Sequence, residues 1–277
     1  MRETITYIRH SLQEIYPSGE LQALIRIIME SVCGLTTCQL LVGKDRDLSA
    51  KERSKIEEIV VGLRQQQPIK YLLGEALFHG MTLKVTPAVL IPRPETAELV
   101  DLVLQDWPAE SSPHLLDVGT GSGCIAITLA LEMPELAVTA TDFSEKALAV
   151  AKDNAETLKA RISFHQGSWY EALPDDARFD IIVSNPPYIH PQDHHLANLR
   201  YEPITALTDG VDGLKDLRAI VTDAPNHLNA NGLLAMEHGW DKGEAVRNLF
   251  DESLWYDVRT IKDLGDNDRV TLGRLKS

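Results

Sequence analysis

LLDVGTGSGCIAITLA, residues 115–130, joins a short apolar run to a helical pattern through three closely spaced glycines. The apolar run is typical of a buried strand, and the segment after the glycines is typical of a helix. Gly119, Gly121 and Gly123 allow the backbone to turn sharply and to approach a ligand that a Cβ atom would exclude. This strand–loop–helix unit predicts an α/β fold with a ligand site at the loop.

The rest of the chain from about residue 95 onward repeats the same alternation of apolar runs and helical patterns. Such alternation is typical of a parallel sheet that is covered by helices on both faces. The predicted strands are 114–118, 137–141, 162–165, 179–184, 232–237, 257–262 and 269–274. No helix separates the last two, so they are expected to form an antiparallel pair at one edge. Residues 95–277 are therefore predicted to form a Rossmann-like domain with a seven-stranded sheet.

The first part of the chain, residues 1–75, has helical patterns only. Apolar residues recur at the spacing of one helix face over 5–15 and again over 21–32. A third helix is predicted to begin after Ser49, because Ser49 and Glu52 form a capping box that satisfies free backbone N–H groups. These residues are interpreted as a small helical domain whose expected task is to recognise a partner.

Residues 76–94 change to a rough period of two, which is typical of strands. Gly80 and Pro87 interrupt the pattern, and both residue types favour turns. A hairpin over 78–91 is therefore predicted, within a linker between the helical domain and the sheet domain.

The glycine loop is compatible with two classes of ligand. Residues 121–126 fit the loose pattern of dinucleotide sites, in which a helix N-terminus holds a pyrophosphate. An acidic residue on the first strand followed by G-x-G-x-G instead resembles the first motif of class-one S-adenosylmethionine methyltransferases. We favour the second interpretation. The loop residues predicted to bind the cofactor are Gly119, Thr120, Gly121, Ser122 and Gly123.

Two residues at later strand ends complete the predicted cofactor site. Asp142 ends the second strand about 20 residues after the glycines, where a carboxylate can accept hydrogen bonds from two ribose hydroxyls. The alternative for Asp142 is a carboxylate that caps a helix or a turn. Trp169 follows the third strand, and its ring is expected either against the purine or in the hydrophobic core.

The chemistry is indicated by Asn185-Pro186-Pro187-Tyr188, which follows the fourth strand. The two prolines remove two N–H donors and fix the backbone, so that carbonyl groups can act as rigid acceptors. Asn185 adds a side-chain oxygen, and two fixed acceptors match the two N–H groups of an amide or aryl amine. Tyr188 offers a flat face to a planar group. These four residues are interpreted as the substrate-binding element, with Asn185, Pro186 and Tyr188 as catalytic residues.

Composition narrows the class of partner. The formal net charge is −14 and no run of lysine and arginine stands out, whereas proteins that bind nucleic-acid phosphates usually carry a basic patch. No apolar run approaches the roughly 18–20 residues that span a bilayer. Three cysteines do not make a disulfide framework, which favours a reducing cytoplasm. Neither a nucleic-acid substrate nor a membrane location is expected.

Two groups of possible metal ligands are not interpreted as metal sites. The segment 190–195 contains three histidines and one aspartate, but it lacks the cysteines or the helical H-x-x-x-H spacing that would support a site. Cys33 and Cys38 have no downstream Cys/His pair, and they are expected to be buried thiols. No metal is predicted.

Motifs along most of the chain resemble the HemK/PrmC-type protein-(glutamine-N5) methyltransferases. Asn-Pro-Pro-Tyr alone is shared with adenine-N6 DNA methyltransferases, so the helical domain and Pro-Arg-Pro-Glu-Thr are the more specific markers. The motifs are Pro68-Ile69-Lys70-Tyr71 with Gly74, residues 90–96 (LIPRPET), 119–123, 185–189, Glu202-Pro203 with Ala206-Leu207, Glu237-His238-Gly239 and Asp268-Arg269-Val270.

The resemblance implies methyl transfer from S-adenosylmethionine to the side-chain amide nitrogen (N5) of a glutamine, with S-adenosylhomocysteine as product. The expected target is the glutamine of the Gly-Gly-Gln motif in bacterial class-one peptide chain release factors. The glycine loop, Asp142, Trp169 and Asn185 would bind the cofactor, and residues 185–188 would hold the glutamine. Two alternatives stay open: an adenine-N6 nucleic-acid methyltransferase, which shares the NH₂ chemistry, and a binding protein that has kept the fold without activity.

Overall fold

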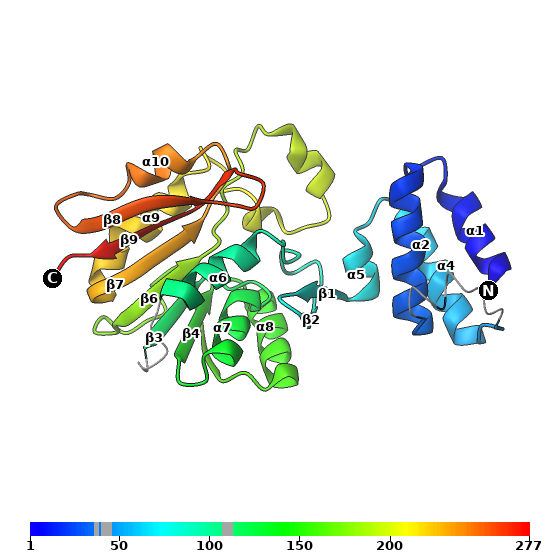
Figure 1. Ribbon diagram of the computed structural model, residues 1–277, viewed down its shortest axis with the longest axis horizontal. Helices are drawn as coiled ribbons and strands as arrows, with labels where there is room; N and C mark the ends of the chain where they lie inside the picture. Colours follow the sequence, from blue (N-terminus) through cyan, green and yellow to red (C-terminus); the bar gives the residue numbers. More distant parts are fainter. Residues whose placement is uncertain (36–38, 40–45, 107–112) are drawn as a thin grey trace. The chain divides into compact units, whose positions relative to one another are not determined.

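A computed structural model describes residues 1–35, 39, 46–106 and 113–277 of the chain (Figure 1). The chain divides into two compact units, Met1–Glu75 and Ala76–Ser277. None of the helices in the described ranges is both long and apolar enough to cross a membrane.

The N-terminal unit is helical and has a hydrophobic core of its own. Its helices are α1 (Arg2–Leu12), α2 (Ser18–Cys33), α4 (Ala50–Arg64) and α5 (Ile69–Leu73). The buried side chains come from the apolar faces that the sequence predicts, and they include Ile8, Leu12, Leu24, Ile28, Met29, Ile56, Ile59 and Leu63. The capping box is present, because Ser49 Oγ accepts from the N–H of Glu52 and a Glu52 carboxylate oxygen accepts from the N–H of Ser49.

A short hairpin opens the second unit, and it lies earlier in the chain than predicted. Its strands are β1 (Glu75–Phe78) and β2 (Met81–Lys84). His79 and Gly80 form the turn with φ of 45° and 77°. Two positive φ values are typical of two-residue hairpin turns, so the pairing closes here and the prediction over 78–91 was wrong in its bounds. The Asn154 side chain accepts from the Lys84 N–H at 2.7 Å, which fastens the hairpin to the rest of this unit.

The second unit is built on a seven-stranded sheet with the strand order β5-β4-β3-β6-β7-β9-β8. The strands are β3 (His114–Val118), β4 (Ala137–Asp142), β5 (Ile162–Gln166), β6 (Phe179–Ser184), β7 (Leu228–Glu237), β8 (Trp255–Lys262) and β9 (Asp268–Leu275). The first five strands run parallel, and β9 pairs antiparallel with both β7 and β8. The predicted strands and the antiparallel edge pair are therefore confirmed, although β7 begins four residues earlier, at Leu228.

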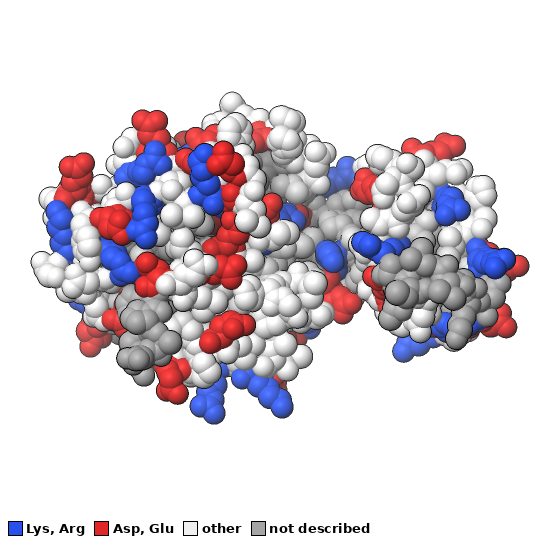
Figure 2. Space-filling view, in the orientation of Figure 1, with Lys and Arg blue, Asp and Glu red and all other residues white. Residues whose placement is uncertain are grey.

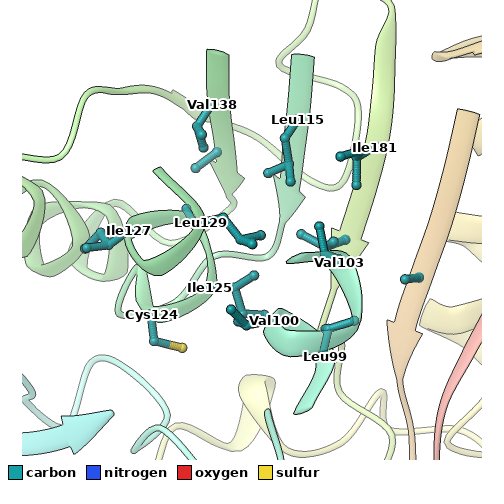
Figure 3. Close-up of a cluster of buried hydrophobic side chains, with 14 of the residues drawn as sticks. Leu99, Val100, Val103, Leu115, Cys124, Ile125, Ile127, Leu129, Val138 and Ile181 are labelled. Carbon is teal, nitrogen blue, oxygen red and sulfur yellow. The ribbon is translucent and has the colours of Figure 1, made fainter. Parts of the chain in front are cut away.

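Helices cover both faces of this sheet, as Figure 1 shows. The helical elements are α6 (Thr96–Asp106), α7 (Cys124–Glu132), α8 (Glu145–Leu158), α9 (Lys215–Asp223), α10 (Gly243–Arg247), η1 (His194–Leu199), η2 (Ile204–Ala206) and η3 (Ala224–Asn226). Side chains alternate along the strands, so that Leu115 joins a core cluster with α6 and α7 while Leu116 joins one with α9 and α10. Figure 3 shows the first cluster, where Val138 and Ile181 point from their strands toward these helices.

Candidate functional site

A cavity of about 630 Å³ lies where the parallel strands β3, β4 and β6 end. Its lining contains nine of the residues predicted for the site: Gly119, Thr120, Gly121, Ser122, Asp142, Trp169, Asn185, Pro186 and Pro187. Gly123 and Tyr188 are predicted site residues that do not line it. Because ligands of open α/β sheets bind beyond the carboxyl ends of the strands, the location is the expected one.

The glycine loop follows β3 directly and has a backbone that only glycine adopts easily. Gly119, Gly121 and Gly123 have φ of 75°, 57° and 84°. The third glycine serves helix packing rather than the cavity, since a Cβ atom there would lie 2.9 Å from Cδ1 of Ile127. The first two glycines are thus the ones that expose backbone to the cavity.

A buried acidic side chain, Asp117, connects this loop to the first turn of α7. It accepts from the Thr120 hydroxyl at 2.6 Å and from the Ala126 N–H at 3.3 Å, and its other oxygen has no hydrogen-bond partner among the described residues. Burial raises the pKa of Asp117 to about 7, and the two hydrogen bonds oppose this change. The loop is therefore supported by a group that gives up its proton near neutral pH.

Replacing Asp117 by asparagine is expected to remove part of the pH dependence of stability. The folded chain keeps a proton on Asp117 between about pH 4 and pH 7 that the unfolded chain has released, so stability falls as pH rises through this window. Relative to wild type, Asp117→Asn should gain about 2.5 kcal/mol in free energy of unfolding between about pH 5 and pH 8. Denaturant unfolding at both pH values measures this gain, and a pH-independent difference would contradict the prediction.

Asp142 ends β4 and directs both carboxylate oxygens toward backbone N–H groups. One oxygen accepts from Gly121 and the other from Ser144, each at 2.9 Å. Burial raises the pKa of Asp142, and the two hydrogen bonds lower it. The carboxylate supports the glycine loop and the turn before α8, while it also lines the cavity. A carboxylate has about four acceptor positions, so it retains the capacity to accept from a ligand.

Trp169 takes part in both the core and the cavity. Its ring packs against the cluster around Leu116 and Val118, and the residue also lines the cavity. A Cβ atom at Gly119 would lie 3.5 Å from the Trp169 ring, and the Trp169 carbonyl accepts from the Thr141 hydroxyl at 2.9 Å. The ring is thus held beside the glycine loop.

The Asn185–Tyr188 segment reaches the cavity with its first three residues. None of the described residues donates a hydrogen bond to Oδ1 of Asn185 or to the carbonyl oxygen of Pro186. Tyr188 is turned elsewhere, because its hydroxyl donates to the Glu237 carboxylate at 3.1 Å. Burial raises the pKa of Tyr188 and the neighbouring Glu237 raises it further. A contact between the Tyr188 ring and a planar substrate stays a prediction.

Comparison with known proteins identifies the family. The model of the PrmC N-terminal domain matches residues 3–74, and that of the methyltransferase small domain matches 98–206. A release factor glutamine methyltransferase of Neisseria gonorrhoeae is 42% identical over 252 residues, which cover 90% of this chain and 92% of the relative. One of Bordetella pertussis is 43% identical over 252 residues, which cover 90% and 93%. The chain belongs to the release factor glutamine methyltransferase family.

A solved structure agrees at the level of the fold. A methyltransferase of Pyrococcus furiosus aligns with a TM-score of 0.55 and 18% identity, covering 83% of this chain and 100% of that chain. The predicted class-one methyltransferase fold is thus confirmed, and the chain is an S-adenosylmethionine-dependent methyltransferase.

Two family motifs, around Arg93 and Glu202, supply residues of the cavity wall for which no role was predicted. Arg93 and Glu202 form an ion pair at 2.5 Å, and the Ile91 N–H donates to the same carboxylate. The Glu202 side chain is 3% exposed, so the loss of Arg93 would leave a buried charge without compensation. The pair fastens two cavity-lining segments, 87–96 and 203–209, to each other.

A third cavity wall comes from α9, through Lys215, Asp216 and Ala219. The helical pattern of this segment gave no sign that it faces a ligand, since its polar residues are typical of a solvated helix face.

The segment predicted not to bind metal contains a close group of possible ligands. The side chains of Asp193, His194 and His195 have ligand atoms within 4.8 Å of one another. Asp193 also accepts from the His195 N–H at 2.8 Å, as the residue that caps η1. This is a local role that a surface turn needs without an ion. Of the two cysteines, Cys33 is half-buried rather than buried, and Cys38 lies outside the described residues.

Proposed function

We propose that this methyltransferase transfers a methyl group from S-adenosylmethionine to N5 of the glutamine in the Gly-Gly-Gln motif of bacterial class-one peptide chain release factors. The observation that carries the proposal is the shared cavity, in which the glycine loop with Asp142 faces the same space as Asn185 and Pro186. The name of the relatives, release factor glutamine methyltransferase, supports the choice of substrate.

The cofactor end of the cavity fits S-adenosylmethionine in size and in polarity. A volume of about 630 Å³ is within the range of small-molecule sites. The exposed backbone at Gly119 and Gly121 would accommodate the ligand closely, the Asp142 carboxylate would accept from the ribose hydroxyls, and the Trp169 ring would border the purine. When bound, S-adenosylmethionine supplies a methyl group on a positively charged sulfur.

The acceptor end fits a carboxamide. An amide nitrogen is a poor nucleophile because its lone pair is delocalised into the carbonyl group. Two fixed acceptors, Asn185 Oδ1 and the Pro186 carbonyl, would take the two N–H groups and orient the nitrogen toward the methyl group. These acceptors stabilise the positive charge that builds up on nitrogen during transfer, so they act more strongly in the transition state than in the ground state. This role requires no general base before transfer.

An adenine NH₂ group would satisfy the same two acceptors, so delivery of the substrate distinguishes the two functions. Flipping a base out of a duplex costs a few kcal/mol, which enzymes of this kind offset by gripping phosphates. With a net charge of −14, this chain is poorly suited to bind the phosphate groups of a nucleic acid. On the face shown in Figure 2, lysine and arginine lie scattered among acidic side chains. We therefore propose a protein substrate, no direct nucleic-acid substrate, and action in the cytoplasm.

The N-terminal unit is proposed to recognise the partner. Its apolar core is separate from those of the second unit. All residues that line the cavity lie in the second unit, between Pro87 and Ala219. The helical unit is thus available for a task other than the chemistry.

Transfer of labelled methyl groups tests the function directly. Labelled S-adenosylmethionine is incubated with a release factor, with the same factor carrying alanine in place of the Gly-Gly-Gln glutamine, and with unmethylated DNA. Label is expected in the intact factor only, on one glutamine nitrogen. Label in the DNA, or equal label in both proteins, would overturn the proposal.

A further inference from the structure

Two hydrogen bonds connect the cavity to a carboxylate that solvent does not reach. Nδ2 of Asn185 donates to Oγ1 of Thr96 at 3.1 Å, and the Thr96 hydroxyl donates to Oε2 of Glu237 at 2.6 Å. Thr96 is 2% exposed and Glu237 is 1% exposed. The three residues lie directly after β6, at the start of α6 and at the end of β7, so the connection exists only in the folded chain.

The number of available hydrogens fixes the direction of this chain of hydrogen bonds. An ionised carboxylate can only accept, so Glu237 takes the single hydroxyl hydrogen of Thr96. The Thr96 oxygen is then left to accept, and Asn185 satisfies it only by turning its NH₂ group toward it. The reversed carboxamide would bring two oxygens together with no hydrogen between them. Oδ1 of Asn185 is thereby directed away from Thr96 and stays available as an acceptor.

The same carboxylate also holds the far end of the substrate-binding segment, because Oε1 of Glu237 accepts from the Tyr188 hydroxyl at 3.1 Å. Burial raises the pKa of Glu237, whereas the hydrogen bonds from Thr96 and Tyr188 and the charge of Arg269 lower it. The charge of Glu95 also raises the pKa of Glu237. The two hydroxyl donors and the cation oppose this rise, and a carboxylate that accepts from a hydroxyl at each oxygen imposes the direction of the hydrogen bonds described above.

We propose that Glu237 is a positioning residue that sets the polarity of the acceptor site. Acting through Thr96, it keeps the Asn185 oxygen toward the substrate and so selects a carboxamide, which brings N–H groups, over a carboxylate, which brings only oxygens. A carboxylate ligand is then disfavoured because its oxygen would face Oδ1 of Asn185 with no hydrogen between them. This inference rests on the proposed function, and it gives a physical role to two residues of the family motifs, Thr96 and Glu237.

Substitutions at Thr96 distinguish the effect of its hydroxyl hydrogen bonds from the effect of its side-chain volume. Thr96→Val keeps the volume but removes the hydroxyl, and Thr96→Ser keeps the hydroxyl. We expect Thr96→Val to lower kcat on the release factor by about tenfold or more, because a hydrogen bond to a charged group is lost, and Thr96→Ser to remain near wild type. Glu237→Gln should behave like Thr96→Val, because a carboxamide at 237 can donate to Thr96 and allow the Asn185 group to reverse.

A release factor with glutamate in place of the target glutamine tests directly whether the site presents the Asn185 oxygen to the substrate. As a competitor it should inhibit wild type weakly, and its affinity relative to the glutamine form should rise by about tenfold in Thr96→Val and in Glu237→Gln. If wild type and both variants prefer the glutamine form over the glutamate form by the same factor, the inference is overturned even if kcat falls. Damage to packing alone would lower kcat without changing this preference. Unfolding midpoints identify a variant that fails to fold. If wild type methylates no release factor, the proposed function itself fails.

Discussion

Replacing Asp142 by alanine is expected to raise the dissociation constant for S-adenosylmethionine by about a hundredfold or more. The reason is the loss of two proposed hydrogen bonds from ribose hydroxyls to a charged acceptor, each worth about 1.5–3 kcal/mol. The same carboxylate accepts from the N–H groups of Gly121 and Ser144, so its removal also loosens the glycine loop. Isothermal titration calorimetry measures the change, and an unchanged dissociation constant would remove Asp142 from the site.

Support of the loop and direct contact with the ribose can be separated with a second ligand. S-adenosylhomocysteine and its analogue without ribose hydroxyls form a double-mutant cycle with wild type and Asp142→Ala. If the carboxylate contacts the ribose, wild type should prefer the hydroxylated ligand and the variant should bind both alike. If Asp142 only supports the loop, both affinities should fall by the same factor. Asp142→Asn, which keeps one acceptor, is the matched control and should show an intermediate preference.

The part of the fold that the sequence predicts well is the part set by local patterns. The strands around Leu115 and Ile181 are continuous apolar runs because helices cover both of their faces, and a run of that kind is visible without any partner. The glycine loop is equally local, since Gly119 and Gly121 need a backbone with positive φ. Both signals place the predicted cofactor residues at the carboxyl ends of the parallel strands. Nine of the predicted site residues line the cavity there.

What the sequence could not predict depends on pairs that are distant along the chain. The contact between Thr96 and Glu237 joins residues 141 positions apart, and that between Arg93 and Glu202 joins residues 109 apart. The local sequence does not show whether a carboxylate in a strand or a loop is buried, because burial depends on a partner elsewhere in the chain that compensates its charge. The role of Tyr188 illustrates the same limit, because its hydroxyl is committed to Glu237.

The N-terminal unit offers the clearest separation of recognition from chemistry. It is a compact unit, Met1–Glu75, with a core formed by its own helices. The cavity-lining residues all belong to the other unit, and the two core clusters of that unit are formed by its own residues. Removing the first unit should therefore leave the cofactor site folded.

A fragment of residues 74–277, which keeps the whole of β1, is expected to bind S-adenosylmethionine with the affinity of the full chain. Its kcat/KM on an intact release factor should fall at least about thirtyfold, the equivalent of losing one interface anchor worth about 2 kcal/mol. A short peptide with the Gly-Gly-Gln motif is the matched control, because it reaches the cavity but offers no further surface. On this peptide, fragment and full chain should act alike. Equal rates on the intact factor would refute partner recognition by the helical unit, whereas an equal loss on peptide and factor would instead mean that the fragment has a damaged site.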